Sequence, residues 1–165
     1  MEQLWAPWRL SYVAGAKPPT ADDPCFLCQG LREDDDRRNL IALRGPRSVV
    51  VLNRFPYNNG HLLVAPRAHK GRLDELEPDE ILETQQALRR MVRALDELMH
   101  ADGYNIGLNL GRVAGAGLPG HLHWHVVPRW SGDTNFMPVL ADVKVIVQSL
   151  DALCDLLVSQ MQRVS

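Results

Sequence analysis

The sequence predicts an α+β domain with a largely antiparallel five-stranded sheet, one long helix and a C-terminal helix. Five short apolar segments are bounded by turn residues, one long segment repeats its apolar residues every three or four positions, and all connections are local. The 165 residues suit about one domain. With 45% apolar and 23% charged residues, the composition excludes collagen-like, coiled-coil and wholly disordered chains.

Short apolar runs, several of them β-branched, predict the strands. The five predicted strands are Leu40–Leu43, Val49–Leu52, His61–Ala65, Tyr104–Leu110 and His121–Val127. The turn Arg44-Gly45-Pro46 separates the first two, as expected for a hairpin, and a loop with four glycines joins the last two.

Two helices follow from three- and four-residue apolar spacing. The long helix is predicted over Pro78–His100, since proline suits the first helical position and acidic residues follow it there. Asp102-Gly103 closes this helix, and a final helix is predicted over Val145–Met161.

Charge and hydropathy limit the partners. The net charge of −2 lacks the basic excess of a nucleic-acid binder, so we expect no nucleic-acid partner. No apolar run approaches the roughly 18 residues of a membrane span, so we expect no membrane partner either. The segment MEQLWAPWRLSYV has no apolar core of a secretory signal. These features predict a cytoplasmic protein.

Half of the six histidines fall within the segment His121–His125. On a strand, the three would share one face at intervals of about 6.6–7 Å, while Leu122, Trp124 and Val126 would face the core. A chance surface pattern is one alternative. A single trihistidine metal site is another, but the outer two rings would lie roughly 13 Å apart. The three histidines must therefore divide their roles.

Cys25 and Cys28 form a C-x-x-C pair, and Cys154 is distant. The pair is open to three interpretations: half of a zinc site, a redox pair, or two packed thiols. His69 and His121 are candidates to complete a Cys₂His₂ zinc set. The apolar residues inside the motif do not support the redox interpretation.

The segment HLHWHVV resembles the signature His-φ-His-φ-His-φ-φ of the histidine triad (HIT) superfamily. NRFPYNNGHLLVAPRAH (Asn53–His69) resembles another shared block of that family, and the C-x-x-C resembles its zinc-bearing members. LWAPWRLSYV, NIGLNLG and HVVPRWSGDTNF are similar to a bacterial branch that includes diadenosine tetraphosphate phosphorylases. The resemblance implies a HIT-like fold, with residues 1–165 forming a single HIT domain with N- and C-terminal extensions.

The resemblance also implies roles for individual residues. His123 would be the nucleophile that forms a nucleotidyl-histidine intermediate, His125 would bind the same phosphate, and His61 would orient the nucleophile. Asn53 matches a position that binds ribose hydroxyls, and Asn109 one that lines the phosphate and ribose region. Cys25, Cys28, His69 and His121 would bind structural zinc, with no organic cofactor, and the family implies a homodimer joined edge to edge.

One departure concerns the loop before the histidine run. Many members carry Gln and Ser where this chain has Gly117 and Leu118. Backbone N–H groups of the loop 111–120, including Gly117, would then contact the substrate. Arg129 and Lys144 are further candidates for phosphate contacts, or ordinary surface charges. Three tryptophans near the family blocks would stack on a base, frame a subunit contact or simply pack: Trp5, Trp8 and Trp130.

The resemblance implies a nucleotidyl transferase or hydrolase that acts on dinucleoside polyphosphates, with phosphorolysis of diadenosine tetraphosphate to ADP and ATP as the leading reaction. A hydrolase of dinucleoside polyphosphates or nucleoside phosphoramidates is the alternative enzyme. A nucleotide-binding adaptor without turnover is the non-enzymatic alternative, and an adaptor has no chemical need for His123.

Overall fold

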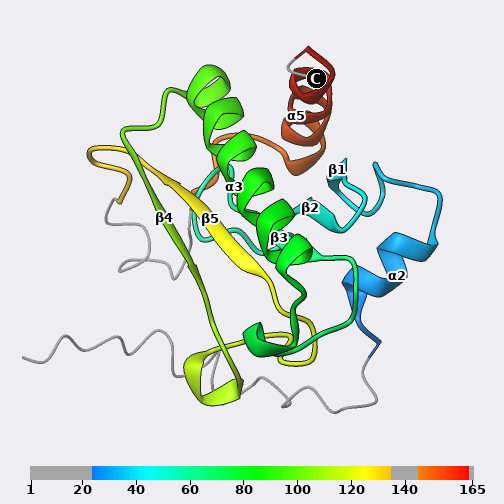
Figure 1. Cartoon of the computed structure of the whole chain (residues 1–165). Coiled ribbons are helices and arrows are strands. Elements are labelled where there is room, and N and C mark those ends of the chain that lie inside the picture. Colours follow the sequence, from blue (N-terminus) through cyan, green and yellow to red (C-terminus); the bar gives the residue numbers. More distant parts are fainter. Residues whose placement is uncertain (1–23, 135–144, 164–165) are drawn as a thin grey trace, which may run out of the picture.

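A single antiparallel sheet organises the computed structural model, which describes residues 24–134 and 145–163 (Figure 1). The strand order is β1-β2-β3-β5-β4, and every neighbouring pair is antiparallel. The strands are β1 (Ile41–Arg44), β2 (Ser48–Leu52), β3 (Leu62–Pro66), β4 (Gly103–Leu108) and β5 (Trp124–Arg129). The predicted α+β class and five-stranded sheet are confirmed.

Three α-helices and two short 3₁₀ turns complete the described part of the chain. They are α2 (Phe26–Arg32), η1 (Leu73–Glu75), α3 (Pro78–Met99), η2 (Arg112–Ala114) and α5 (Leu150–Arg163). Helix α3 lies across one face of the sheet, and α5 packs beside it against β1 (Figure 1). None of the helices in these described ranges is long and apolar enough to cross a membrane.

Strand β2 separates two apolar clusters because its side chains alternate between the faces of the sheet. Val50 and Leu52 belong to the larger cluster, which lies between the sheet and the helices α3 and α5. Val49 and Val51 belong to a smaller cluster on the opposite face, together with Leu27 of α2. Both faces of the central strands are therefore buried, which gives the sheet a rigid base for functional side chains.

The ends of α3 are set by specific residues. Glu77 and Glu80 form a capping box around Pro78 at its beginning. At its end His100 adopts a left-handed conformation with φ 49°, and the Trp130 indole N–H donates to the carbonyls of Met99 and His100. Trp130 therefore packs on the end of the helix, which supports ordinary packing among the three roles considered for this residue.

The structure corrects several predicted boundaries. Strand β5 begins at Trp124 rather than at His121, because backbone bonds from His121 to Leu118 and from Leu122 to Lys70 take those residues out of the ladder. Helix α2 was not predicted, since seven residues are too few for a clear apolar period.

Smaller shifts occur at the ends of other elements. Strand β1 begins after Leu40, whose φ of 57° does not fit a strand. Strand β3 covers Leu62–Pro66 rather than His61–Ala65, because the backbone N–H of His61 donates to the carbonyl of Asn58 instead of entering the ladder. Strand β4 covers Gly103–Leu108 rather than Tyr104–Leu110. Helix α5 covers Leu150–Arg163 rather than Val145–Met161.

Candidate active site and metal centre

The histidine run serves two separate clusters, as the spacing argument predicts. His121 is fully buried and turns toward α2 and the loop after β3. His123 and His125 instead contact each other edge to face, with ring centroids 5.1 Å apart. The division is sharper than strict strand alternation would give, because His121 and His123 lie before β5 begins.

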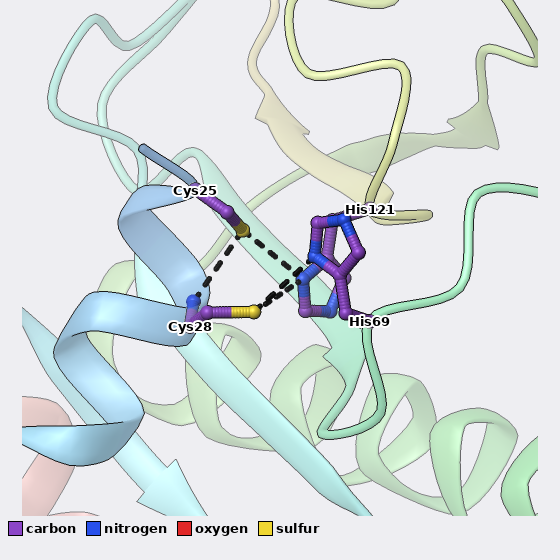
Figure 2. A group of neighbouring side chains, drawn as sticks. All are labelled: Cys25, Cys28, His69 and His121. Carbon is purple, nitrogen blue, oxygen red and sulfur yellow. Dashed lines mark hydrogen bonds between the residues drawn. The ribbon is translucent and has the colours of Figure 1, made fainter. Parts of the chain in front are cut away.

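The first cluster consists of Cys25, Cys28, His69 and His121, whose ligand atoms all lie within 4.8 Å of one another (Figure 2). The Cys25 sulfur lies 3.2 Å from Nδ1 of His121, and the Cys28 sulfur lies 3.3 Å from Nδ1 of His69. The two cysteines come from the start of α2, where Cys25 is the N-cap and accepts the backbone N–H of Cys28. Residues 96 positions apart in the sequence thus meet at one point.

The geometry of this cluster fits a tetrahedral metal ion. With bonds of about 2.3 Å to sulfur and 2.0–2.1 Å to nitrogen, neighbouring ligand atoms should be about 3.5 Å apart. The observed sulfur–nitrogen distances of 3.2–3.5 Å agree with this value. In addition, Nε2 of His121 donates to the Pro66 carbonyl at 2.8 Å, so Nδ1 keeps its lone pair for a metal. The four residues can therefore hold a metal ion.

The second cluster contains the nucleophile candidate. Nδ1 of His123 lies 2.8 Å from the backbone oxygen of His121. A carbonyl only accepts hydrogen bonds, so Nδ1 carries the proton and Nε2 keeps its lone pair. Burial lowers the pKa of His123 below its usual value, which keeps the ring neutral near pH 7. A neutral imidazole with a free Nε2 is the form that attacks an electrophile.

His61 acts on His125 rather than directly on His123. The backbone N–H of Tyr57 donates to Nδ1 of His61 at 3.0 Å. Nε2 of His61, the other ring nitrogen, therefore carries the proton and donates to Nδ1 of His125 at 2.9 Å. By the same logic, Nε2 of His125 is an N–H donor. Burial, reinforced by the neighbouring His123, lowers the pKa of His125 to about 4.

Asn53 joins this cluster, whereas two other predicted contacts do not. The amide nitrogen of Asn53 lies 3.3 Å from Nδ1 of His61, and its oxygen accepts the backbone N–H of Phe55. Asn109 and Gly117 both lie between β4 and β5, and no hydrogen bond joins either to the three histidines within the described ranges. The Asn109 amide instead lies 3.8 Å from the position of a Cβ at Gly115.

Arg129 is held by its own chain. Its guanidinium forms a two-pronged ion pair with Asp133 and donates to the side chain of Asn105. This arrangement supports the surface-charge alternative for Arg129. Three further candidates, Trp5, Trp8 and Lys144, lie outside the described residues.

Tyr57 is the residue that sequence reasoning missed at this site. Its ring lies over His61 at a centroid distance of 4.6 Å and is stacked on His125 at 5.8 Å. The only signal in the sequence is its position inside the block Asn53–His69, because a tyrosine in a polar loop has no periodicity that would indicate contact with two histidines.

Comparison with known proteins agrees with this geometry. The HIT domain model matches residues 37–132, so the chain belongs to the HIT family. It is 37% identical to an AP-4-A phosphorylase of Mycobacterium tuberculosis over 91% of this chain and 79% of that protein.

Solved structures show the same fold. A zinc-bound histidine triad family protein of Mycobacterium smegmatis is 27% identical, with a TM-score of 0.62 over 76% of this chain and 85% of that chain. A hypothetical histidine triad nucleotide-binding protein of Sulfolobus tokodaii shares the fold at 22% identity, with a TM-score of 0.68 over 85% and 93% of the two chains.

Proposed function

We propose that this protein cleaves dinucleoside polyphosphates through a nucleotidyl group carried on Nε2 of His123, and that inorganic phosphate accepts this group. With diadenosine tetraphosphate as substrate, the products are ADP and ATP. The observation that carries the proposal is the bond from Nδ1 of His123 to the carbonyl of His121, which leaves Nε2 as the free nucleophile. The likeness to the AP-4-A phosphorylase supports the choice of substrate.

The reaction has two balanced steps. In the first, the Nε2 lone pair of His123 attacks the α-phosphorus, the bond from that phosphorus to the bridging oxygen breaks, and ATP leaves with the bonding electrons. The ring now carries AMP and a positive charge, which the carbonyl of His121 stabilises through Nδ1–H. In the second step, a phosphate oxygen attacks the same phosphorus, the P–N bond breaks, and ADP leaves a neutral His123.

The neighbouring residues have supporting roles in this proposal. The Nε2–H of His125 donates to an oxygen of the α-phosphate, where charge develops as the nucleophile adds. His61 holds His125 in that tautomer. Asn53 binds the ribose hydroxyls through its amide from the edge of the same cluster.

The loop between β4 and β5 is proposed to contact the polyphosphate and the acceptor. Gly117 is exposed, and a Cβ there would meet nothing within 4 Å. Its backbone N–H can therefore be approached by an anion without a side chain in the way. Asn109 is proposed to line the same region. This backbone contact would replace the Gln and Ser that many relatives carry at the positions of Gly117 and Leu118.

Product analysis with diadenosine tetraphosphate tests the acceptor. We expect turnover to rise with phosphate concentration and saturate, giving ADP and ATP in equal amounts. In phosphate-free buffer, one equivalent of ATP should appear while AMP stays bound to the protein. If AMP and ATP form at a rate indifferent to phosphate, water is the acceptor and the protein is a hydrolase. If binding occurs without any product, the adaptor alternative holds.

Zinc is the proposed occupant of the Cys25, Cys28, His69 and His121 cluster, because two sulfurs and two imidazole nitrogens are a standard zinc set and the M. smegmatis relative is zinc-bound. The ion would supply a cross-link between α2, the loop after β3 and the start of the histidine run. His121 would then be fixed on both sides, by the metal at Nδ1 and by Pro66 at Nε2. Its carbonyl, which orients His123, would be fixed with it.

We further propose a cytoplasmic homodimer. In the described sheet, β4 is an edge strand, and Ile106 on it is 48% exposed. Pairing two such edges would satisfy the free backbone groups of both. Sedimentation equilibrium measures the mass of the particle in solution and so decides between monomer and dimer.

Residues 1–165 are proposed to form a single HIT domain with extensions. Helix α2 precedes residues 37–132 in the sequence and α5 follows them, and both helices pack on the same sheet.

A further inference from the structure

The segment between β2 and β3 holds a tyrosine ring against the second histidine cluster, and three anchors fix this loop. At one end the backbone N–H of Asn53 donates to the carbonyl of His61 at 2.9 Å. In the middle the Asn58 amide donates to the carbonyl of Pro128 and to the carboxylate of Asp133. At the other end Gly60 is in tight contact with Met99 and uses a conformation that favours glycine. Tyr57 is therefore presented from a well-anchored loop.

Tyr57 contacts the histidine pair in two ways. Its backbone N–H determines which nitrogen of His61 accepts, as described above. Its ring covers His61 at 4.6 Å and lies nearly parallel to His125, at an interplanar angle of 22°. His61 is only 1% exposed, whereas Tyr57 is 53% exposed, so the tyrosine ring lies between the buried imidazole and the solvent.

This cover matters because the orientation and the tautomer of the His125 ring decide whether an N–H group faces the substrate. A half-turn of its ring would put Cδ2 in the place of Nδ1 and Cε1 in the place of Nε2. The bond to His61 would break, the N–H donor would no longer face the phosphate, and the proton would be free to move between the two ring nitrogens. A flat aromatic ring stacked on the imidazole opposes that turn by steric contact. It also keeps water, which would compete as donor and acceptor, away from the bond between His61 and His125.

We propose that Tyr57 is a positioning residue, whose aromatic ring holds the hydrogen-bonded pair His61–His125 in the one tautomer that presents Nε2–H of His125 to the phosphate. This inference rests on the proposed function for its effect on turnover. It adds a residue of the loop 53–60 to the machinery, acting through two histidines rather than on the substrate itself.

The test compares three variants in the full-length protein. Tyr57→Ala removes the ring and keeps the backbone N–H. Tyr57→Phe keeps the ring. Phe55→Ala is the matched control, because it removes an aromatic ring from the same loop where that ring is 81% exposed. We expect Tyr57→Ala to lower kcat for diadenosine tetraphosphate by roughly 10- to 100-fold with KM changed less than about threefold, and Tyr57→Phe to restore kcat to within about threefold.

Nitrogen-15 NMR of the imidazole rings supplies a readout independent of turnover. In the unmodified protein, Nδ1 of His125 should give a signal of the unprotonated type and Nε2 one of the protonated type. Tyr57→Ala should average these two signals, while Phe55→Ala should leave them unchanged. A folded Tyr57→Ala protein with unaveraged signals and normal kcat would overturn the inference, and so would an effect on KM alone. If diadenosine tetraphosphate is not a substrate, the proposed function fails and the NMR result still decides the role of Tyr57.

Discussion

His121 and His123 are two residues apart, yet their rings are held in opposite tautomers. His121 meets the Pro66 carbonyl at Nε2 and points an unprotonated Nδ1 at two cysteine sulfurs. His123 meets the carbonyl of His121 at Nδ1 and keeps an unprotonated Nε2. The same side chain is thus suited to bind a metal ion in one cluster and to act as a nucleophile in the other. The difference lies in which ring nitrogen the nearest backbone oxygen occupies.

The two clusters also differ in their relation to the fold. The metal cluster draws its residues from α2, the loop after β3 and the segment before β5, so it joins parts that are distant in the sequence. The histidine pair joins His61, which directly precedes β3, to His125 on β5, and these two strands are neighbours in the sheet. We therefore expect damage to the first cluster to lower stability more than chemistry, and damage to the second to do the reverse.

The largest effect should come from His123→Asn, which removes the proposed nucleophile. We expect kcat to fall by about 10⁴-fold or more, because covalent catalysis loses its only attacking atom, while nucleotide binding and the melting temperature stay close to those of the unmodified protein. Steady-state kinetics, nucleotide titration and thermal denaturation measure the three quantities.

The matched control is His100→Asn, which changes an exposed histidine at the end of α3 to a residue that also accepts the left-handed conformation. A folded His123→Asn protein that turns over substrate at the normal rate would remove the proposed mechanism.

A smaller effect should follow from Cys25→Ser, which should lower metal content and stability rather than turnover. Elemental analysis should find about one zinc per chain in the unmodified protein and much less in the variant. The melting temperature should fall by roughly 5–10 °C, as expected when a ligand present at about a hundredfold its dissociation constant no longer binds. The specific activity of the fraction that stays folded should change less than about threefold.

Cys154→Ser is the control for metal content, since Cys154 on α5 is buried in the larger apolar cluster. Metal-free protein of unchanged stability would show that Cys25 and Cys28 are a packed thiol pair.

The smallest effect concerns the loss of stability at acid pH, to which His125 of the second cluster should contribute. Folding lowers the pKa of His125 to about 4, against about 6.5 in the unfolded chain. Between these values the unfolded state binds more protons, so stability is fully present above about pH 6.5 and falls as the pH drops toward 4. Between pH 7 and pH 5, the free energy of unfolding should therefore fall by about 1–2 kcal/mol less in the His125→Asn variant than in the unmodified protein. Urea denaturation at the two pH values measures this difference. Parallel curves for the two proteins would contradict this assignment.

The fold class was predictable because its signals are local. Three- and four-residue spacing indicates α3, and β-branched runs indicate β2, from side chains that repeat on one face. The boundaries were less predictable. Helix α2 has only seven residues, and β5 starts at Trp124 because backbone bonds to Leu118 and Lys70 hold the preceding residues. Such bonds depend on segments far away in the chain.

The candidate site was likewise predictable where the signal is local and not where it depends on distant segments. The alternation of three histidines was enough to show that one ion could not bind them all, and the C-x-x-C pointed to a metal that needed two more ligands. That His61 contacts His125 rather than His123, that Arg129 is tied to Asp133, and that Tyr57 covers the pair could not be read from spacing. Each of these contacts joins side chains from separate segments, and their approach is set by packing.

The sequence by itself determined which chemical groups are present and in what order: three alternating imidazoles, a thiol pair, and the apolar patterns that build the sheet. It could do so because side-chain chemistry and local periodicity belong to the chain whatever its fold. Only the tertiary structure decided which nitrogen of each ring carries the proton. That choice depends on a backbone carbonyl or N–H within about 3 Å. For His121 this neighbour is the carbonyl of Pro66, which approaches only in the folded protein. For His123 it is the carbonyl of His121 in the same segment, whose path is set by backbone bonds to Leu118 and Lys70.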